Sequence, residues 1–225
     1  MSIKENLAVV RKNIAAAAER AGRSVDEILL VAVSKTYPAD DIIEALECGV
    51  TDIGENRVQE MCEKNPQLPP NTNIHLIGHL QTNKVKQAVK NAVMIHSVDS
   101  VKLAEEISKV SVKEGVNTQI LLQVNVAEDE AKFGIAEEEL DGVLAEIVTL
   151  PGITVRGLMT VPAIETDPET TRGYFRKLRE LFEKCKAKGY KFDQLSMGMS
   201  GDYEIAVEEG ATMVRVGSKI FGARN

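Results

Sequence analysis

The stretch Leu29-Leu30-Val31-Ala32-Val33-Ser34-Lys35 decides the fold class of this 225-residue chain and also points to its chemistry. An apolar run of this length, followed by a turn at Tyr37-Pro38, is typical of a strand buried on both faces of a parallel sheet. Lys35 stands at the carboxyl end of that strand. A lysine is rarely placed there for packing, because burying an unpaired ammonium group is costly.

Lys35 is a candidate for covalent attachment of a carbonyl compound. A lysine in a partly desolvated pocket keeps some free amine, which can form a Schiff base with an aldehyde. The alternative is a lysine whose stem covers apolar surface while its ammonium group reaches solvent. This segment alone does not separate the two, and the deciding residues lie near the other end of the chain.

The composition excludes several classes of function. Hydrophobic residues make up 44% of the chain and charged residues 27%, as in ordinary soluble globular proteins. A net charge of −7 and only 4% aromatic residues argue against a nucleic-acid partner. No stretch approaches the roughly 18 apolar residues that span a bilayer, and the amino terminus has no signal core. Cys48, Cys62 and Cys185 are scattered without CxxC spacing, so we expect reduced thiols in a cytoplasmic protein that has no membrane partner.

Apolar strands alternate with amphipathic helices along the whole chain. We predict a helix at 3–20 and then eight strands, at 29–34, 52–56, 74–79, 93–97, 119–126, 153–159, 194–197 and 213–216. Helices are predicted between them, most clearly at 39–48, 101–114, 137–150 and 169–188. Eight strand–helix units favour a closed (β/α)8 TIM barrel over an open doubly wound sheet. No linker divides the chain, so we predict a single α/β domain over 1–225 with an extra amino-terminal helix.

Two turns rich in glycine and serine follow the last two predicted strands. They are Ser196-Met197-Gly198-Met199-Ser200-Gly201-Asp202 and Val216-Gly217-Ser218-Lys219, and each leads into a short helix. Barrel enzymes frequently bind phosphate at this position, because glycine lets N–H groups approach the anion and the helix terminus adds partial positive charge. Either turn alone is also ordinary in an α/β protein. Their joint position next to the first strand of a closed barrel favours a phosphate site.

Arg215 places a charge inside the predicted strand 213–216. Taken alone, it is equally compatible with an arginine paired to a carboxylate within the barrel. Together with Lys35 and the two turns, however, it matches the requirements of pyridoxal 5′-phosphate (PLP). That cofactor needs an amine for its aldehyde, donors for its phosphate and a partner for its ring nitrogen.

The chain resembles the pyridoxal phosphate homeostasis protein family over essentially its whole length. The matching segments are 31–36 (VAVSKT), 53–60 (IGENRVQE), 75–84 (HLIGHLQTNK), 158–160 (LMT), 195–200 (LSMGMS), 214–218 (VRVGS) and 221–224 (FGAR). The resemblance implies a single barrel like the amino-terminal domain of alanine racemase, that is, PLP-dependent fold type III without the carboxyl-terminal β-domain. It also implies a cofactor site that consists of Lys35 as Schiff-base lysine, Ser200, Gly217 and Ser218 around the phosphate, Arg215 at the ring nitrogen and Asn56 beside the cofactor.

The same resemblance implies a regulator that binds, buffers or delivers PLP and has no catalytic residue. Arginine keeps its proton, so it would donate to an unprotonated ring nitrogen, which is a poorer electron sink than a protonated one. Apo PLP-dependent enzymes are the expected recipients, and we expect a monomer. A PLP-dependent amino-acid racemase is the alternative, with Tyr37 as the tyrosine near the expected barrel mouth. We expect no second domain, since the chain ends at Asn225 soon after the predicted phosphate helix.

Three histidines fall on adjacent predicted strands, a pattern that also raises the possibility of a metal site. His75 and His79 share a face of one strand but lie about 13 Å apart by strand rise. His96 is on the next strand. We therefore expect no shared metal ion.

Overall fold

Eight parallel strands form a closed barrel in the computed structural model, which describes residues 2–127, 133–162 and 167–222. Each strand pairs with the next in sequence, and β8 pairs back with β1. The strands are β1 (Leu29–Val33), β2 (Asp52–Glu55), β3 (Asn73–Leu76), β4 (Met94–Val98), β5 (Thr118–Gln123), β6 (Ile153–Met159), β7 (Gln194–Ser196) and β8 (Met213–Val216). The predicted (β/α)8 barrel is confirmed. Ala223 and Arg224, which belong to one matching segment, lie outside the described residues.

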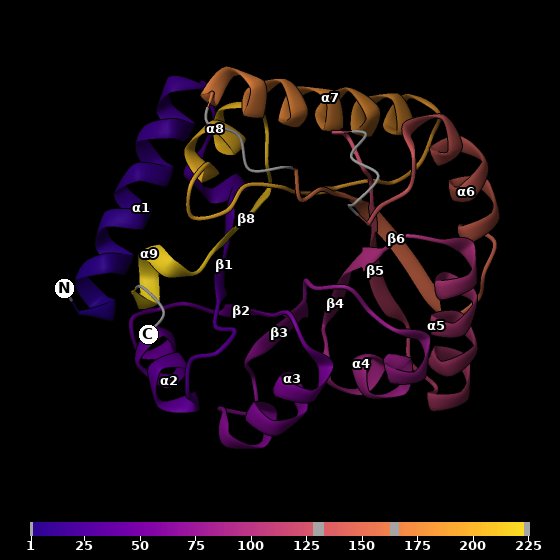
Figure 1. The fold of residues 1–225 in the computed structure, drawn as a ribbon, viewed down its shortest axis with the longest axis horizontal. Helices are drawn as coiled ribbons and strands as arrows, with labels where there is room; N and C mark the ends of the chain where they lie inside the picture. The colour runs from indigo at the N-terminus through magenta and orange to yellow at the C-terminus, as the bar shows by residue number, and fades with distance from the viewer. Residues whose placement is uncertain (1, 128–132, 163–166, 223–225) are drawn as a thin grey trace.

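Helices surround the ring of strands (Figure 1). They are α1 (Ile3–Arg20), α2 (Ala39–Glu47), α3 (Val58–Lys64), α4 (Val85–Asn91), α5 (Val101–Glu114), α6 (Leu140–Ile147), α7 (Pro168–Ala187), α8 (Tyr203–Glu208) and α9 (Ser218–Phe221). Local sequence explains where several of them begin: Ser2 and Glu5 form a capping box before α1, and Asp167 accepts N–H bonds at the start of α7. None of the helices in the described ranges is long and apolar enough to cross a membrane.

The apolar residues pack in two places because strand side chains alternate between the two faces of the sheet. The larger core fills the space between the strands and the helices. A smaller cluster within the barrel consists of Met94, Leu121, Met159 and Met213, with Leu29 packed against it. Several other barrel positions carry buried polar side chains, and these bear on the candidate site.

Two strands end three residues earlier than the hydrophobic pattern predicts. β3 stops at Leu76 instead of continuing to 79, and the chain then turns against β2: a Cβ on Gly78 would lie 2.2 Å from the carbonyl oxygen of Asn56. β5 stops at Gln123, although Val124 is buried and forms an isolated bridge with Ile135. After β5 burial continues past the end of the strand, whereas after β3 Ile77 is half-buried and His79 is exposed. Hydrophobicity alone overestimates the strand in both cases.

The additional helix α1 supports the two short helices that follow β7 and β8. Three polar residues recur along α1 every seven positions, so they lie on one face of the helix. Each binds a partner on α8 or α9: Asn6 donates to the Ile220 carbonyl at 2.9 Å, Asn13 to the Tyr203 hydroxyl at 3.0 Å, and Arg20 pairs with Glu208 at 2.7 Å. α1 therefore holds both loops of the predicted phosphate site in place.

Candidate functional site

The pairing of β1 with β8 brings the two ends of the chain's predicted site together. Val31 lies opposite Arg215, and Lys35 follows four residues later, just beyond the end of β1. Gly217 packs closely against β1: a Cβ there would lie 3.0 Å from the Val33 carbonyl oxygen and 3.3 Å from its Cβ. Lys35 is half-buried. The structure thus places Lys35, Gly217 and Arg215 at the same seam of the barrel.

The two glycine- and serine-rich turns contact each other. The Gly217 N–H donates to Ser200 Oγ at 3.0 Å, and the Arg215 N–H donates to the Gly198 carbonyl at 3.0 Å. Ser218 is exposed and begins α9. Because the Ser200 hydroxyl accepts the bond from Gly217, its own proton remains available for another acceptor. Hydroxyl and N–H donors of both turns are therefore gathered in one place.

Asn56 and Arg215 retain hydrogen-bonding capacity that no group in the described ranges uses. Asn56 Oδ1 is buried and has no partner within the described ranges. Arg215 uses two N–H groups, one to Ser196 Oγ at 2.5 Å and one to the Thr160 carbonyl at 2.8 Å. Buried polar atoms are nearly always hydrogen-bonded in native proteins. These atoms fit a ligand that carries both donors and acceptors.

Arg215 keeps its charge although it is buried, at 3% exposure. Burial lowers the pKa of its guanidinium to about 10, and the charge of Asp202 opposes that effect. At neutral pH the group is therefore protonated and acts only as a donor. Its direct partners in the part of the chain that the structure describes are a hydroxyl and a carbonyl, so the carboxylate partner considered from the sequence is not in hydrogen-bonding contact.

An ion cluster on the far side of the backbone from the barrel interior fixes the segment that carries Lys35. Lys64 Nζ, on α3, donates to the Ser34 carbonyl at 2.7 Å, to Glu55 Oε1 at 2.8 Å and to Glu60 Oε1 at 2.7 Å. Ser34 Oγ also donates to Glu55 Oε1, at 2.6 Å. Lys64 and Glu55 are both buried. This cluster was not predicted from the sequence. The spacing of Glu60 and Lys64 by four residues on a helix indicates an ion pair and was the signal for it.

The residues that follow Lys35 are also held from outside the barrel. Thr36 has a φ of +72°, which is unusual for a residue other than glycine, and its N–H donates to Glu60 at 2.5 Å. The Tyr37 hydroxyl donates to the Gly222 carbonyl at 2.7 Å, and its ring stacks on Phe221 with centroids 5.0 Å apart. Tyr37, the tyrosine considered for a racemase, therefore connects the Lys35 segment to α9.

The histidines bond to one another and to a carboxylate. His75 Nδ1 lies 2.8 Å from His96 Nε2, and His75 Nε2 lies 2.8 Å from Asp52 Oδ1. His79 is separate and stacks on Phe133 with centroids 3.9 Å apart. No group of three or more potential metal ligands occurs in the described residues. The sequence analysis placed His75 and His96 on adjacent strands but did not foresee the contact between them.

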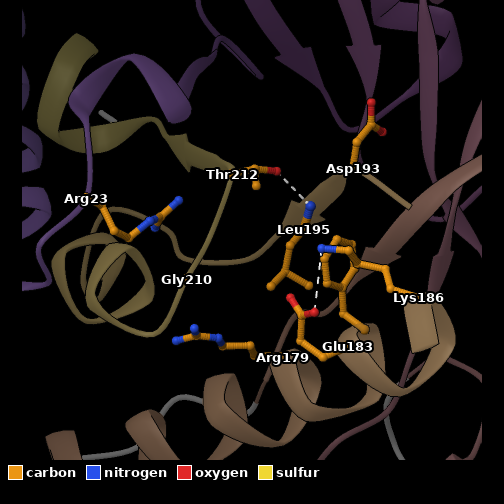
Figure 2. Close-up of a pocket in the computed structure, with 9 residues that line it drawn as sticks. Arg23, Arg179, Glu183, Lys186, Asp193, Leu195, Gly210 and Thr212 are labelled. Atoms are coloured by element: carbon orange, nitrogen blue, oxygen red, sulfur yellow. Dashed lines mark hydrogen bonds and ion pairs between the residues drawn. The ribbon is translucent and has the colours of Figure 1, made fainter. Parts of the chain in front are cut away.

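A separate cavity of about 220 Å³ lies between α7 and the residues that precede β7 and β8 (Figure 2). Three basic side chains line it, from Arg23, Arg179 and Lys186. Acidic groups compensate two of them: Arg23 pairs with Glu27 at 3.2 Å and Lys186 with Glu183 at 3.5 Å. Gly210 and Thr212, which precede β8, also line this cavity. It therefore lies at the opposite end of the strand from Gly217 and is distinct from the candidate site.

Known proteins resemble this chain in both sequence and fold. The family model described as alanine racemase, N-terminal domain, matches residues 6–225. The pyridoxal phosphate homeostasis protein of Aquifex aeolicus is 43% identical over 226 residues, covering 100% of this chain and 99% of that protein. PipY of Synechococcus elongatus PCC7942, solved with PLP bound, has a TM-score of 0.87 at 35% identity and covers 98% and 100% of the two chains. An alanine racemase from Clostridium difficile 630, at 19% identity and a TM-score of 0.77, shares the fold over 99% of this chain and 57% of its own.

Replacing Lys64 tests how strongly the ion cluster supports the Lys35 segment. Burial raises the pKa of Glu55, and the Lys64 and Ser34 hydrogen bonds counteract that rise. Lys64→Met leaves the carboxylate buried and unpaired, so we expect the free energy of unfolding to fall by about 3–5 kcal/mol near neutral pH. Urea unfolding curves measure the change.

The pH dependence of this loss identifies its cause. A carboxyl whose pKa is raised by folding binds a proton more readily in the folded state, so its unfavourable contribution is relieved as the pH falls. Lys64→Met should therefore recover part of the lost stability at about pH 5, above the ordinary pKa of glutamate. Adding Glu55→Gln should remove that pH dependence. If Lys64→Met lowers the free energy of unfolding equally at neutral pH and at pH 5, the loss does not come from the unpaired Glu55 carboxylate.

Proposed function

We propose that this chain binds PLP and holds it for other proteins. It belongs to the pyridoxal phosphate homeostasis protein family and carries an alanine racemase N-terminal domain. The relatives that share its full length carry the homeostasis name. PLP is bound to the related PipY, and both chains have the same barrel. We place the protein in the cytoplasm as a monomeric carrier, with apo PLP-dependent enzymes as its recipients.

One observation carries the proposal for this chain. An amine on Lys35, a buried acceptor without a partner on Asn56 and unused guanidinium donors on Arg215 lie at one end of the same barrel as the joined serine- and glycine-rich turns. Their chemistry matches PLP, whose aldehyde condenses with an amine and whose phosphate and ring nitrogen require donors.

Each residue has a definite role in this proposal. Lys35 holds the cofactor covalently, and the ion cluster around Lys64 fixes the backbone on both sides of it. Ser200 and Ser218 supply hydroxyl donors to the phosphate, Gly217 joins the two turns around it through its bond to Ser200, and α1 keeps their loops in register. Arg215 donates to the ring nitrogen. Asn56 lies beside the cofactor, with its amide oxygen available to accept a hydrogen bond.

Covalent capture at Lys35 is the first test. Borohydride reduction of the protein incubated with PLP should add the cofactor's mass to the peptide that contains Lys35, because reduction makes the carbon–nitrogen bond permanent. Peptide mass spectrometry locates the adduct. Lys35→Ala should give no adduct, whereas Lys102→Ala, an exposed lysine on α5, should label like the unmodified protein. Labelling spread over many surface lysines would contradict a specific site.

The phosphate site is tested by comparing PLP with pyridoxal, which lacks the phosphate. Combining Ser200→Ala with Ser218→Ala should weaken PLP binding by about 1.5–3 kcal/mol per lost charge-assisted hydrogen bond. Pyridoxal binding should change far less. Fluorescence or absorbance titration gives both affinities, and an equal loss for the two ligands would place the phosphate elsewhere.

Delivery is tested by transfer. PLP-loaded protein mixed with an apo PLP-dependent enzyme should restore that enzyme's activity in the presence of a scavenger that removes free PLP. Loaded Lys35→Ala, which holds the cofactor only by noncovalent contacts, is expected to lose its PLP to the scavenger faster. The control is free PLP added with the scavenger. If the loaded protein restores no more activity than this control, the delivery role is wrong and a storage role remains.

The racemase alternative is separated by incubation of the loaded protein with L-alanine in heavy water. The carrier predicts negligible deuterium at Cα and no D-alanine. Rapid exchange that is lost in Tyr37→Phe would instead show that the protein is a racemase and that Tyr37 takes part in the reaction.

A further inference from the structure

A continuous path of hydrogen bonds crosses the barrel from Asp52 to Arg215, and we call it the interior polar chain. Its links are Asp52 Oδ1 to His75 Nε2 at 2.8 Å, His75 Nδ1 to His96 Nε2 at 2.8 Å, His96 Nδ1 to Ser196 Oγ at 3.0 Å and Arg215 Nη1 to Ser196 Oγ at 2.5 Å. All five residues are buried. His96 is on β4 and Ser196 on β7, which are not neighbouring strands, so this link spans the interior.

The two charged ends allow only one direction for the donors. Arg215 can only donate, so Ser196 Oγ accepts from it and directs its own proton to His96 Nδ1. His96 then carries its proton on Nε2 and donates to His75 Nδ1. His75 in turn donates from Nε2 to the Asp52 carboxylate. With the opposite tautomers, the lone pair of His75 Nε2 would face the carboxylate and the Ser196 proton would lack an acceptor.

The protonation states agree with this direction. Burial, together with the nearby His75 and Arg215, holds the pKa of His96 well below its ordinary value, so the ring is neutral at pH 7. Burial alone would raise the pKa of Asp52, but hydrogen bonds from His75 and from Thr51 Oγ1 (2.6 Å) outweigh it and lower the pKa. Asp52 is therefore a carboxylate, so the interior polar chain runs from a buried cation at Arg215 to an anion at Asp52.

Arg215 depends on this chain because its other surroundings provide little to fix it. A buried guanidinium needs oriented partners, since it has lost its water. Only Ser196 and the Thr160 carbonyl bind it directly within the described ranges, and Asp202 acts on it through its charge. Donation of the Ser196 proton to His96 keeps the lone pairs of Ser196 Oγ directed toward Arg215. The orientation of Arg215 is thus set by residues up to four strands away along the sheet.

We propose that Asp52, His75, His96 and Ser196 are positioning residues that fix the guanidinium of Arg215 so that its unused N–H groups face the ring nitrogen of bound PLP. This inference rests on the proposed function. None of the four residues needs to touch the cofactor. Their loss therefore affects one cofactor atom selectively and leaves the phosphate and the Lys35 contacts intact.

Two matched variants of His75 isolate the effect. His75→Gln retains a donor toward Asp52 and an acceptor toward His96, whereas His75→Leu removes both. The probes are PLP and its analogue with carbon in place of the ring nitrogen, titrated against each protein. The preference for PLP over the analogue should fall about tenfold in His75→Leu, the size of one hydrogen bond. It should be largely kept in His75→Gln, and the affinity for the analogue should be the same in all three proteins.

The outcomes separate the inference from the function. If the unmodified protein binds both ligands and His75→Leu weakens them equally, the positioning role is wrong and the carrier function stands. If the unmodified protein binds neither ligand, the proposed function fails and this inference with it. If His75→Leu does not fold, Asp52→Asn supplies the same comparison. It keeps a side-chain oxygen toward His75 but removes the negative charge that sets the direction of the donors.

Nitrogen-15 NMR of the unliganded, unmodified protein tests the chain independently of any ligand. His96 should show the neutral tautomer protonated at Nε2, and Asp52→Asn should weaken that preference. A His96 ring protonated at Nδ1 would overturn the direction and with it the inference.

Discussion

The pairing of β1 with β8 closes the barrel, and the candidate site depends on that closure. Residues 29–32 lie in register with residues 213–216, so segments from opposite ends of the chain share one seam. Lys35 extends from one strand of the seam, while Arg215, Gly217 and Ser218 come from the other. The loop after β7 joins them through the bond between Ser200 and Gly217. An open sheet with the same strands would leave these groups at its two distant edges.

Polar groups lie on both faces of the sheet near this seam, and each set offsets the cost of burial by mutual hydrogen bonding. Outside the barrel, Lys64 neutralises Glu55 and fixes the carbonyl of Ser34. Inside it, Asp52 and Arg215 are connected through His75, His96 and Ser196 instead of a direct ion pair. The outer set holds the backbone beside Lys35, and the inner set orients a guanidinium. Rigid support from both faces is what a site needs to hold a small ligand in one orientation.

The sequence predicted the architecture and where the candidate residues lie in the barrel, but not the residues that support them. Hydrophobic alternation located all eight strands, and strand order in a closed barrel placed Lys35 near Arg215. The contact between His96 and Ser196 is different, because it joins β4 to β7 across the interior and depends on the stagger of every strand between them. The left-handed conformation of Thr36 also has no signal in the sequence, since the Glu60 contact that supports it comes from the following strand–helix unit.

The seven-residue spacing of Asn6, Asn13 and Arg20 on α1 has a consequence for biosynthesis. α1 precedes all eight strands in the chain, yet it supports α8 and α9, which follow β7 and β8. During translation the two loops of the candidate phosphate site therefore lack this support until α8 and α9 have been made and dock on α1. Closing a loop of nearly the full chain length is slow but costs little additional entropy. The geometry of both loops would then depend on a contact between segments that are far apart in translation.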